Sequence, residues 1–306
     1  MLRLYTHPAC LQHDPGQGHV ERPSRLHAVL RELDHDRFAA LDRSEAPQAT
    51  REQLLRVHDA AHVAEIMVGA PPEAMLALDQ DTVMGPGSTE SALRAAGAVV
   101  AAVDAVLGGS AQRAFCAVRP PGHHATRERA MGFCLFNNVA VAAAHALAVH
   151  GLRRVAIADF DVHHGNGTQD IFEREPRVLF ASSHQSPLYP DSGREDERGC
   201  GNIVNGVLSP GAGSHEFREL WDAVLLPRLH AFKPQLVLVS VGFDAHRNDP
   251  LADIRLGSED YAWITGRLAA LADAHADGRL VSTLEGGYDL AALAASTCAH
   301  VGALME

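Results

Sequence analysis

The chain has 306 residues, of which 46% are hydrophobic and 21% charged, and this composition excludes fibrous and intrinsically disordered classes. Its formal net charge of −12 argues against direct nucleic-acid binding, which needs clustered Lys and Arg side chains, and suits a cationic or neutral ligand better. Histidine is enriched, at 19 copies, which indicates metal or acid–base chemistry unless the histidines are simply scattered over the surface.

Helices and strands are predicted to alternate along the chain. In chain order, the hydrophobic pattern predicts a helix over 88–107, a strand over 114–118, a helix over 138–150, strands over 155–162 and 178–182, a helix over 217–232, a strand over 236–241, a helix over 261–276 and a strand over 280–284. Several of these strands are wholly apolar, which is typical of parallel strands buried on both faces. We therefore predict one domain over residues 1–306, a three-layer α/β/α sandwich with a mainly parallel central sheet.

The cysteines and the apolar segments indicate a cellular location. The five cysteines are odd in number and contain no C-x-x-C pair, which argues against a disulfide framework and a structural zinc knuckle. The N-terminal residues lack the long apolar core of a secretory signal, and no apolar run reaches the roughly 18 residues of a membrane span. We expect reduced thiols in a cytoplasmic protein that does not associate with membranes.

Polar clusters follow the predicted strands. Segments rich in His, Asp and Gly begin where the apolar strands end, at 119–124, 159–167, 182–184, 242–246 and 285–288. Ligands of open parallel α/β sheets bind at the carboxyl ends of the strands. We therefore expect all five clusters to meet at one edge of the sheet.

One of these clusters has the pattern of a metal site. In an extended chain, Asp159, Asp161 and His163 share a face, because alternate side chains point the same way. Asp161 and His163, joined by Asp244 from another strand end, can offer three ligands to one divalent ion and leave a position open for catalysis. The alternative is a buried Asp–His hydrogen bond without a metal.

Two further patterns indicate acid–base chemistry. His123 and His124 follow a Pro-Pro-Gly bend, where both can face a cleft and handle protons. Tyr288 follows two glycines and can donate a hydrogen bond to a developing oxyanion. Considered singly, the histidines could be a solvent-exposed pair and the tyrosine a packing residue. A dinucleotide loop and a nucleophilic serine are excluded, because the G-x-G-x-x-G and G-x-S-x-G patterns are missing.

These motifs together resemble a known family, the zinc-dependent histone deacetylase superfamily, and within it the class II-like bacterial histone deacetylase-like amidohydrolases and the acetylpolyamine amidohydrolases. The motifs that carry the resemblance are HVERPSRL at 19–26, PPGHH at 120–124, GFCLFNN at 132–138, DFDVHHGNGT at 159–168, GFDA at 242–245 and EGGY at 285–288. The resemblance runs from about Tyr5 nearly to the end of the chain. It implies an arginase-like α/β/α fold and a metal-dependent hydrolase of amide bonds.

The resemblance also implies roles for the catalytic residues. Asp161, His163 and Asp244 would hold one zinc ion per chain, with Fe²⁺ or Co²⁺ as alternative metals. His124 would be the general base, and His123 its electrostatic partner.

Residues beside this centre have implied roles as well. Asp159 would orient His123 and help bind a structural potassium ion, to which Ser182 would contribute. Asn166, behind His124, stands where class I members have an aspartate. His164 and His184 are expected to be structural.

The implied substrate site is a tunnel for an acylated lysine side chain. Tyr288 would polarise the acyl carbonyl, with Gly132 and Phe133 forming one tunnel wall and Tyr189 the other, where the family usually has phenylalanine. Leu251 stands where polyamine-selective eukaryotic relatives carry a glutamate, and its apolar side chain favours acyl-lysine.

Other substrates and other functions stay open. Asp79, Asp81 and Ser88 lie in a segment that could border the tunnel mouth, and acetylpolyamines or other small acylated amines are the alternative substrates. An arginase-like dinuclear ureohydrolase and a non-catalytic acyl-binding protein are the rival functions. The sequence leaves the oligomeric state undetermined.

Overall fold

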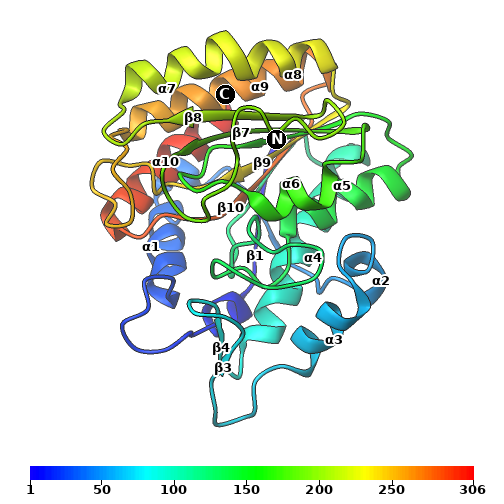
Figure 1. Cartoon of the computed structure of the whole chain (residues 1–306), viewed down its shortest axis with the longest axis vertical. Helices are drawn as coiled ribbons and strands as arrows, with labels where there is room; N and C mark the ends of the chain where they lie inside the picture. The colour runs from blue at the N-terminus through cyan, green and yellow to red at the C-terminus, as the bar shows by residue number, and fades with distance from the viewer.

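Figure 1 shows the computed structural model, which describes residues 1–306. A parallel sheet of eight strands forms the centre of the molecule. Its strand order is β2-β1-β5-β10-β9-β6-β7-β8, and every neighbouring pair is parallel. The strands are β1 (Leu2–Thr6), β2 (Asp42–Glu45), β5 (Arg113–Cys116), β6 (Val155–Asp159), β7 (Val178–Gln185), β8 (Ile203–Leu208), β9 (Leu236–Val241) and β10 (Leu280–Leu284). A small antiparallel pair, β3 (Leu76–Ala77) and β4 (Val83–Met84), lies apart from this sheet.

Helices cover both faces of the sheet (Figure 1). Helices α7, α8 and α9 lie on one face, where α9 also packs against α10, and α4 and α5 pack together on the other. The α-helices are α1 (Pro23–Leu33), α2 (Arg51–Leu54), α3 (Ala60–Val68), α4 (Ser88–Leu107), α5 (Asn138–Ala148), α6 (Asn166–Phe172), α7 (Ser214–Leu220), α8 (Leu226–Phe232), α9 (Ser258–His275) and α10 (Leu290–Met305). The predicted sandwich with a parallel sheet is confirmed. No helix has the length and apolarity needed to span a bilayer.

Several predicted elements differ from the observed ones at their ends. The bounds of α4, β9 and β10 are those predicted, whereas the strand predicted over 155–162 ends at Asp159 and the one predicted over 178–182 continues to Gln185. The helix predicted over 217–232 begins at Ser214 and contains a π-helical turn, η3 (Trp221–Leu225), just before Pro227. The wider turn lies where proline cannot donate the usual helical hydrogen bond.

The strand order explains how the predicted clusters meet. The strands β5, β10, β9, β6 and β7 are consecutive in the sheet. Four of the polar clusters follow β5, β10, β9 and β6, and the cluster at 182–184 lies at the carboxyl end of β7 itself. Because these strands are parallel, all five clusters lie along the same edge. Every residue of these five strands is buried, so that the sheet holds the clusters on a rigid base.

Candidate active site and metal centre

Three buried side chains converge between two neighbouring strands. Asp161 and His163 follow β6, and Asp244 follows β9. Nδ1 of His163 lies 3.1 Å from Oδ1 of Asp161 and 3.2 Å from Oδ2 of Asp244, and the three ligand atoms lie within 4.8 Å of one another. Two carboxylates and one imidazole around a single point form a donor set typical of a catalytic metal centre.

Backbone groups and glycines hold the two carboxylates in place. Asp161 accepts a hydrogen bond on Oδ2 from the N–H of Gly286 at 2.8 Å, and Asp244 accepts one on Oδ1 from the N–H of Val162 at 2.9 Å. A Cβ atom at Gly242 would collide with the Asp161 carboxylate, and one at Gly286 would collide with that of Asp244. Only glycine therefore leaves room at both positions for this donor set.

The electrostatics of this centre favour a cation. Burial alone lowers the pKa of His163, but hydrogen bonds to Asp161 and Asp244 outweigh it and raise that pKa to about 10. Burial alone raises the pKa of Asp161, but the charges of His123 and His163 outweigh it and lower that pKa. Positive charge therefore stabilises the buried carboxylates, and a divalent ion can supply that charge.

The two adjacent histidines lie in opposite electrostatic surroundings. Nδ1 of His123 donates to Oδ2 of Asp159 at 3.0 Å, and the charges of Asp161 and Asp159 overcome burial and raise the pKa of His123 to about 10. Nδ1 of His124 donates to Oδ1 of the neutral Asn166 at 2.8 Å, and burial and the neighbouring histidines lower the pKa of His124 well below its usual value. These surroundings favour the form of His123 that carries a proton on both nitrogens and the neutral form of His124, in which Nε2 keeps a lone pair.

Two buried polar residues hold the segment that carries these histidines. Oε2 of Glu285 accepts from the N–H groups of Gly122 and His123 at 2.6 and 3.2 Å. The side-chain amide nitrogen of Asn137, the residue that caps the N-terminus of α5, donates to the carbonyls of His123 and Ala125 at 3.4 and 3.1 Å. Strand β10 and helix α5 together fix the position of the histidine pair.

Tyr288 is held from its backbone and from its ring. Its N–H donates to Oδ2 of Asp249 at 2.7 Å, and the guanidinium carbon of Arg25 lies 4.8 Å from the centroid of its ring. Arg25 also donates to the carbonyls of Gly287 and Glu285 at 2.6 Å each. Burial raises the pKa of Tyr288 well above its usual value, although Arg25 lowers it, so that the phenol keeps its proton at neutral pH.

A pocket of about 220 Å³ opens onto these residues. It is lined by Asp81, His124, Gly132, Phe133, His163, Leu188, Tyr189, Leu251 and Tyr288. The predicted base, one predicted metal ligand and the predicted phenol therefore share one cavity with all four residues predicted to bind substrate. Its mixed apolar and polar lining is typical of a small-molecule site.

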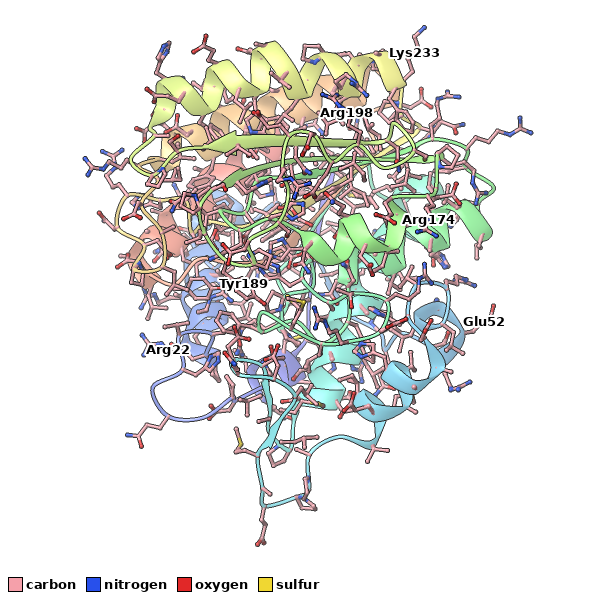
Figure 2. The ribbon with its side chains drawn as sticks, viewed as in Figure 1. Arg22, Glu52, Arg174, Tyr189, Arg198 and Lys233 are labelled. Atoms are coloured by element: carbon pink, nitrogen blue, oxygen red, sulfur yellow. The ribbon has the colours of Figure 1, made fainter.

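The walls of the pocket are aromatic and tightly packed. The backbone at Phe133 has a φ of 68°, and a Cβ atom on the preceding Gly132 would contact the His124 ring at 2.5 Å. Tyr189, labelled in Figure 2, lies on the segment after β7, and its ring centroid is 5.2 Å from that of His124. Gly132 thus allows the segment to approach the histidine closely.

Other predicted site residues lie outside the pocket. Ser182 pairs with Asp159 across β7 and β6, and its Oγ lies 3.0 Å from Nδ1 of His184. Ser88, expected at the tunnel mouth, is fully buried and lies 2.7 Å from His13, so that part of the prediction is wrong. Asp79 is exposed and orders the turn by accepting from the N–H groups of Asp81 and Thr82, whereas Asp81 lines the pocket.

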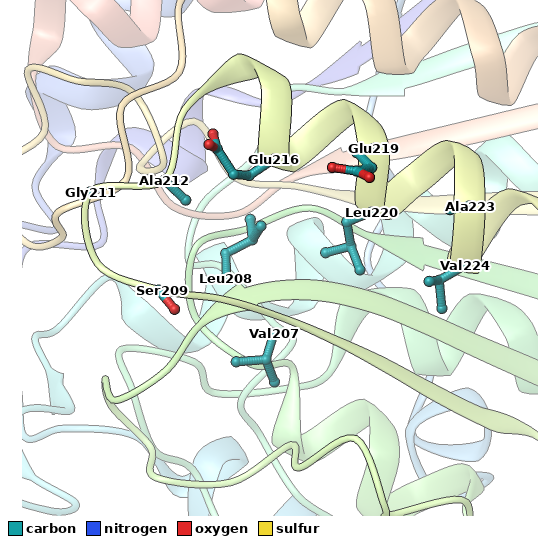
Figure 3. Close-up of a pocket in the computed structure, with 10 residues that line it drawn as sticks. All are labelled: Val207, Leu208, Ser209, Gly211, Ala212, Glu216, Glu219, Leu220, Ala223 and Val224. Carbon is teal, nitrogen blue, oxygen red and sulfur yellow. The ribbon is translucent and has the colours of Figure 1, made fainter.

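A larger pocket on the molecule lacks this chemistry. Figure 3 shows a groove between β8 and the helical segment of α7 and η3. The volume of this groove is about 580 Å³. Its lining is mainly aliphatic, with two glutamates, Glu216 and Glu219, and contains no histidine. The smaller pocket is therefore the candidate active site.

The family follows from comparison with known proteins. A family model described as "Histone deacetylase domain" matches residues 19–304. The chain belongs to the histone deacetylase family. This histone deacetylase family member is 44% identical, over 277 residues, to a histone deacetylase-like amidohydrolase from Pseudomonas aeruginosa, with 89% of this chain and 73% of that protein covered.

Two further comparisons agree with the predicted fold and enzyme class. A polyamine deacetylase from Homo sapiens is 38% identical over 311 residues, which cover 95% of this chain and 45% of that protein. The crystal structure of the HDA15 HD domain superposes with a TM-score of 0.95 at 35% identity, covering 99% of this chain and 88% of that chain. These findings support the predicted enzyme class for this histone deacetylase family member, a hydrolase acting on amide bonds.

Several residues that hold or line the site were not predicted from the sequence. Arg25 and Asp249 contact Tyr288, and Asn137 contacts the backbone of His123. Leu188 lines the pocket. Arg25 belongs to the motif at 19–26, but only the fold shows that α1 places its guanidinium against Tyr288.

Proposed function

We propose that the chain is a zinc-dependent deacylase that removes N-acyl groups from lysine side chains or similar amines. The observation that carries the proposal is that one pocket of about 220 Å³ is lined by His124, His163 and Tyr288. A base, a metal ligand and an oxyanion donor are thus within reach of one substrate carbonyl. The residues that form or hold this site come from segments between α1 and the end of β10, with Tyr288 just beyond it. This spread along the chain supports one catalytic domain over residues 1–306.

Asp161, His163 and Asp244 would hold the metal. Their buried oxygens and nitrogen already face one point, and the glycines beside them leave the space that the donor set needs. When bound, zinc supplies Lewis-acid polarisation of the acyl carbonyl and lowers the pKa of water. Mixed oxygen and nitrogen ligands also suit Fe²⁺ or Co²⁺.

The two histidines divide the proton chemistry. His124, neutral with its lone pair on Nε2, accepts a proton from the attacking water. His123, held protonated beside Asp159, stabilises the negative charge that develops on the tetrahedral intermediate. A protonated histidine then returns a proton to the leaving amine, which releases a carboxylate and a free amine.

Tyr288 stabilises the developing oxyanion. Its phenol keeps its proton, lines the pocket and donates a hydrogen bond toward the substrate oxygen. The stacked Arg25 and the backbone contact to Asp249 hold the ring in place, which lowers the cost of organising it during the reaction.

A potassium ion would occupy the region behind His123. Asp159 and Ser182 lie side by side in the sheet there, and Asp159 is fully buried. Carboxylate, hydroxyl and carbonyl oxygens suit a hard monovalent cation, and the ion would balance buried negative charge. Asn166 contacts the second histidine, His124, rather than His123.

The pocket favours acyl-lysine as substrate. Leu251, Phe133 and Leu188 give it apolar walls that suit the methylene chain of lysine. Acetylpolyamines are the second candidate, because Asp81 also lines the pocket and supplies negative charge for a second ammonium group.

A substrate panel tests the proposal. Metal-loaded enzyme should release acetate from acetyl-lysine peptides faster than from acetylputrescine or acetylspermidine, and metal-stripped enzyme should release none. Faster turnover of the polyamines would favour the second candidate. Failure of the loaded enzyme to hydrolyse any acylated amine would overturn the proposed function.

A further inference from the structure

A second group of metal-ligating side chains lies outside the pocket, where α4 and α5 end. Nε2 of His145, on α5, and Nε2 of His150, just beyond it, each lie 2.7 Å from Oδ1 of Asp104 on α4. The three ligand atoms lie within 4.8 Å of one another. The Asp104 side chain is 51% exposed, so that an ion can reach the group from solvent.

We propose that Asp104, His145 and His150 form a second metal site, which binds a late first-row divalent ion such as Zn²⁺. One carboxylate and two imidazoles suit these metals, and water can complete the coordination because the group is open on one side. Opening the two 2.7 Å contacts by a few tenths of an ångström gives the separation of ligands around one ion.

The ends of two helices favour a cation at this place. Helix α4 ends at Leu107 and α5 at Ala148, so that Asp104 and His145 both lie in the last turn of their helix. The carboxyl end of a helix carries partial negative charge. The field of both helices therefore attracts a positive ion to the three side chains.

Arg56 competes with the metal and sets its affinity. Its NH1 donates to Nδ1 of His145 at 3.0 Å, which places the imidazole proton on Nε2, the atom that would bind the ion. Metal on Nε2 moves that proton to Nδ1, which can then no longer accept from Arg56. The guanidinium can withdraw to Glu52, which it already contacts at 3.1 Å and which points outward from α2 in Figure 2.

The bound ion would join α4 to α5. Helix α5 begins beside Asn137, which holds the segment of the catalytic histidines, but the metal group lies at the opposite end of the helix. We therefore expect the ion to stabilise the fold while leaving the chemistry in the pocket unchanged.

Metal counting and thermal unfolding test this site. Enzyme with a loaded catalytic centre is titrated with Zn²⁺, and bound metal per chain, Tm and turnover are measured. The wild-type chain should bind a second ion, and at free Zn²⁺ about a hundredfold above Kd its Tm should rise by about 4 °C. Asp104→Asn and His150→Gln should lose the second ion and the Tm shift while keeping turnover.

Two further variants sharpen the test. His215→Gln is the matched control, because His215 also faces a carboxylate, Glu219, at 3.7 Å but lacks a third ligand. It should keep the second ion. Arg56→Gln should bind that ion about tenfold more tightly, because an amide oxygen can accept from Nδ1.

Clear outcomes would overturn the inference. These are a wild-type chain that binds no second ion, or an Asp104→Asn or His150→Gln chain that binds it unchanged. If Arg56→Gln bound the second ion with unchanged or weaker affinity, competition between Arg56 and the metal for His145 would be refuted. None of these results bears on turnover in the catalytic pocket, so that the proposed function stands or falls separately.

Discussion

Replacement of Tyr288 by phenylalanine removes one hydroxyl from the active site and changes little else. The ring keeps its stacking with Arg25, at 4.8 Å, and its edge contact with Phe133, whose ring centroid lies 5.9 Å away. The backbone contact to Asp249 does not involve the side chain. Tyr288→Phe should therefore fold normally and keep its metal.

The lost hydroxyl should cost about 3 kcal/mol of transition-state stabilisation. This is the typical effect of removing one donor from an oxyanion hole, and it corresponds to about a 10²- to 10³-fold loss of kcat. Because the hydrogen bond forms mainly in the transition state, KM for an acetyl-lysine peptide should change little. Steady-state turnover, with bound metal measured on the same sample, checks both expectations.

Tyr261→Phe is the matched control. Tyr261 is fully buried on α9, outside the pocket, and its hydroxyl has no hydrogen-bond partner. Its removal should leave turnover unchanged. Turnover of Tyr288→Phe within about twofold of wild type, with metal bound, would refute the role of this phenol.

Three further changes test other parts of the site. Gly286→Ala should lower metal affinity by more than about tenfold, measured by competition with a chelator, because the added Cβ would displace a ligating carboxylate. Gly266→Ala, on α9, is the control, because a Cβ there meets no neighbour and should leave metal affinity unchanged. Asn166→Asp should raise the pKa of His124, and since a base works when neutral, the acid limb of the pH–rate profile should move up by about one unit; an unmoved limb would contradict His124 as the base. Leu251→Glu should shift kcat/KM toward acetylspermidine about fivefold relative to an acetyl-lysine peptide, and no shift would exclude Leu251 from substrate selection.

Apolar strands and their polar ends could be predicted from local sequence. The strands β9 and β10 are continuous apolar runs with sharp ends, and their bounds matched the prediction. The edge strands β2 and β8 were missed, because β2 is largely polar and β8 contains Asn205 and Gly206. Tertiary pairing with β1 and β7, rather than local preference, makes these segments strands.

The site shows the same division between local and long-range information. The spacing of Asp161 and His163 predicted that their side chains would point the same way, and they do. The alternation of side-chain direction continues beyond the end of β6 at Asp159, since Phe160 packs away from the site, against Tyr261. Contacts made across the fold could not be predicted this way. Arg25 lies 263 positions before Tyr288 in the sequence, and only the packing of α1 brings them together.

Zinc titration of metal-stripped enzyme determines how many metal ions per chain the turnover requires. The Asp104→Asn chain is used, so that the second metal group does not contribute, and turnover of an acetyl-lysine peptide is followed at each addition. We expect no turnover without metal and full turnover at one zinc ion per chain. Turnover that survives stripping, or that needs two ions per chain, would contradict a mononuclear metal-dependent deacylase.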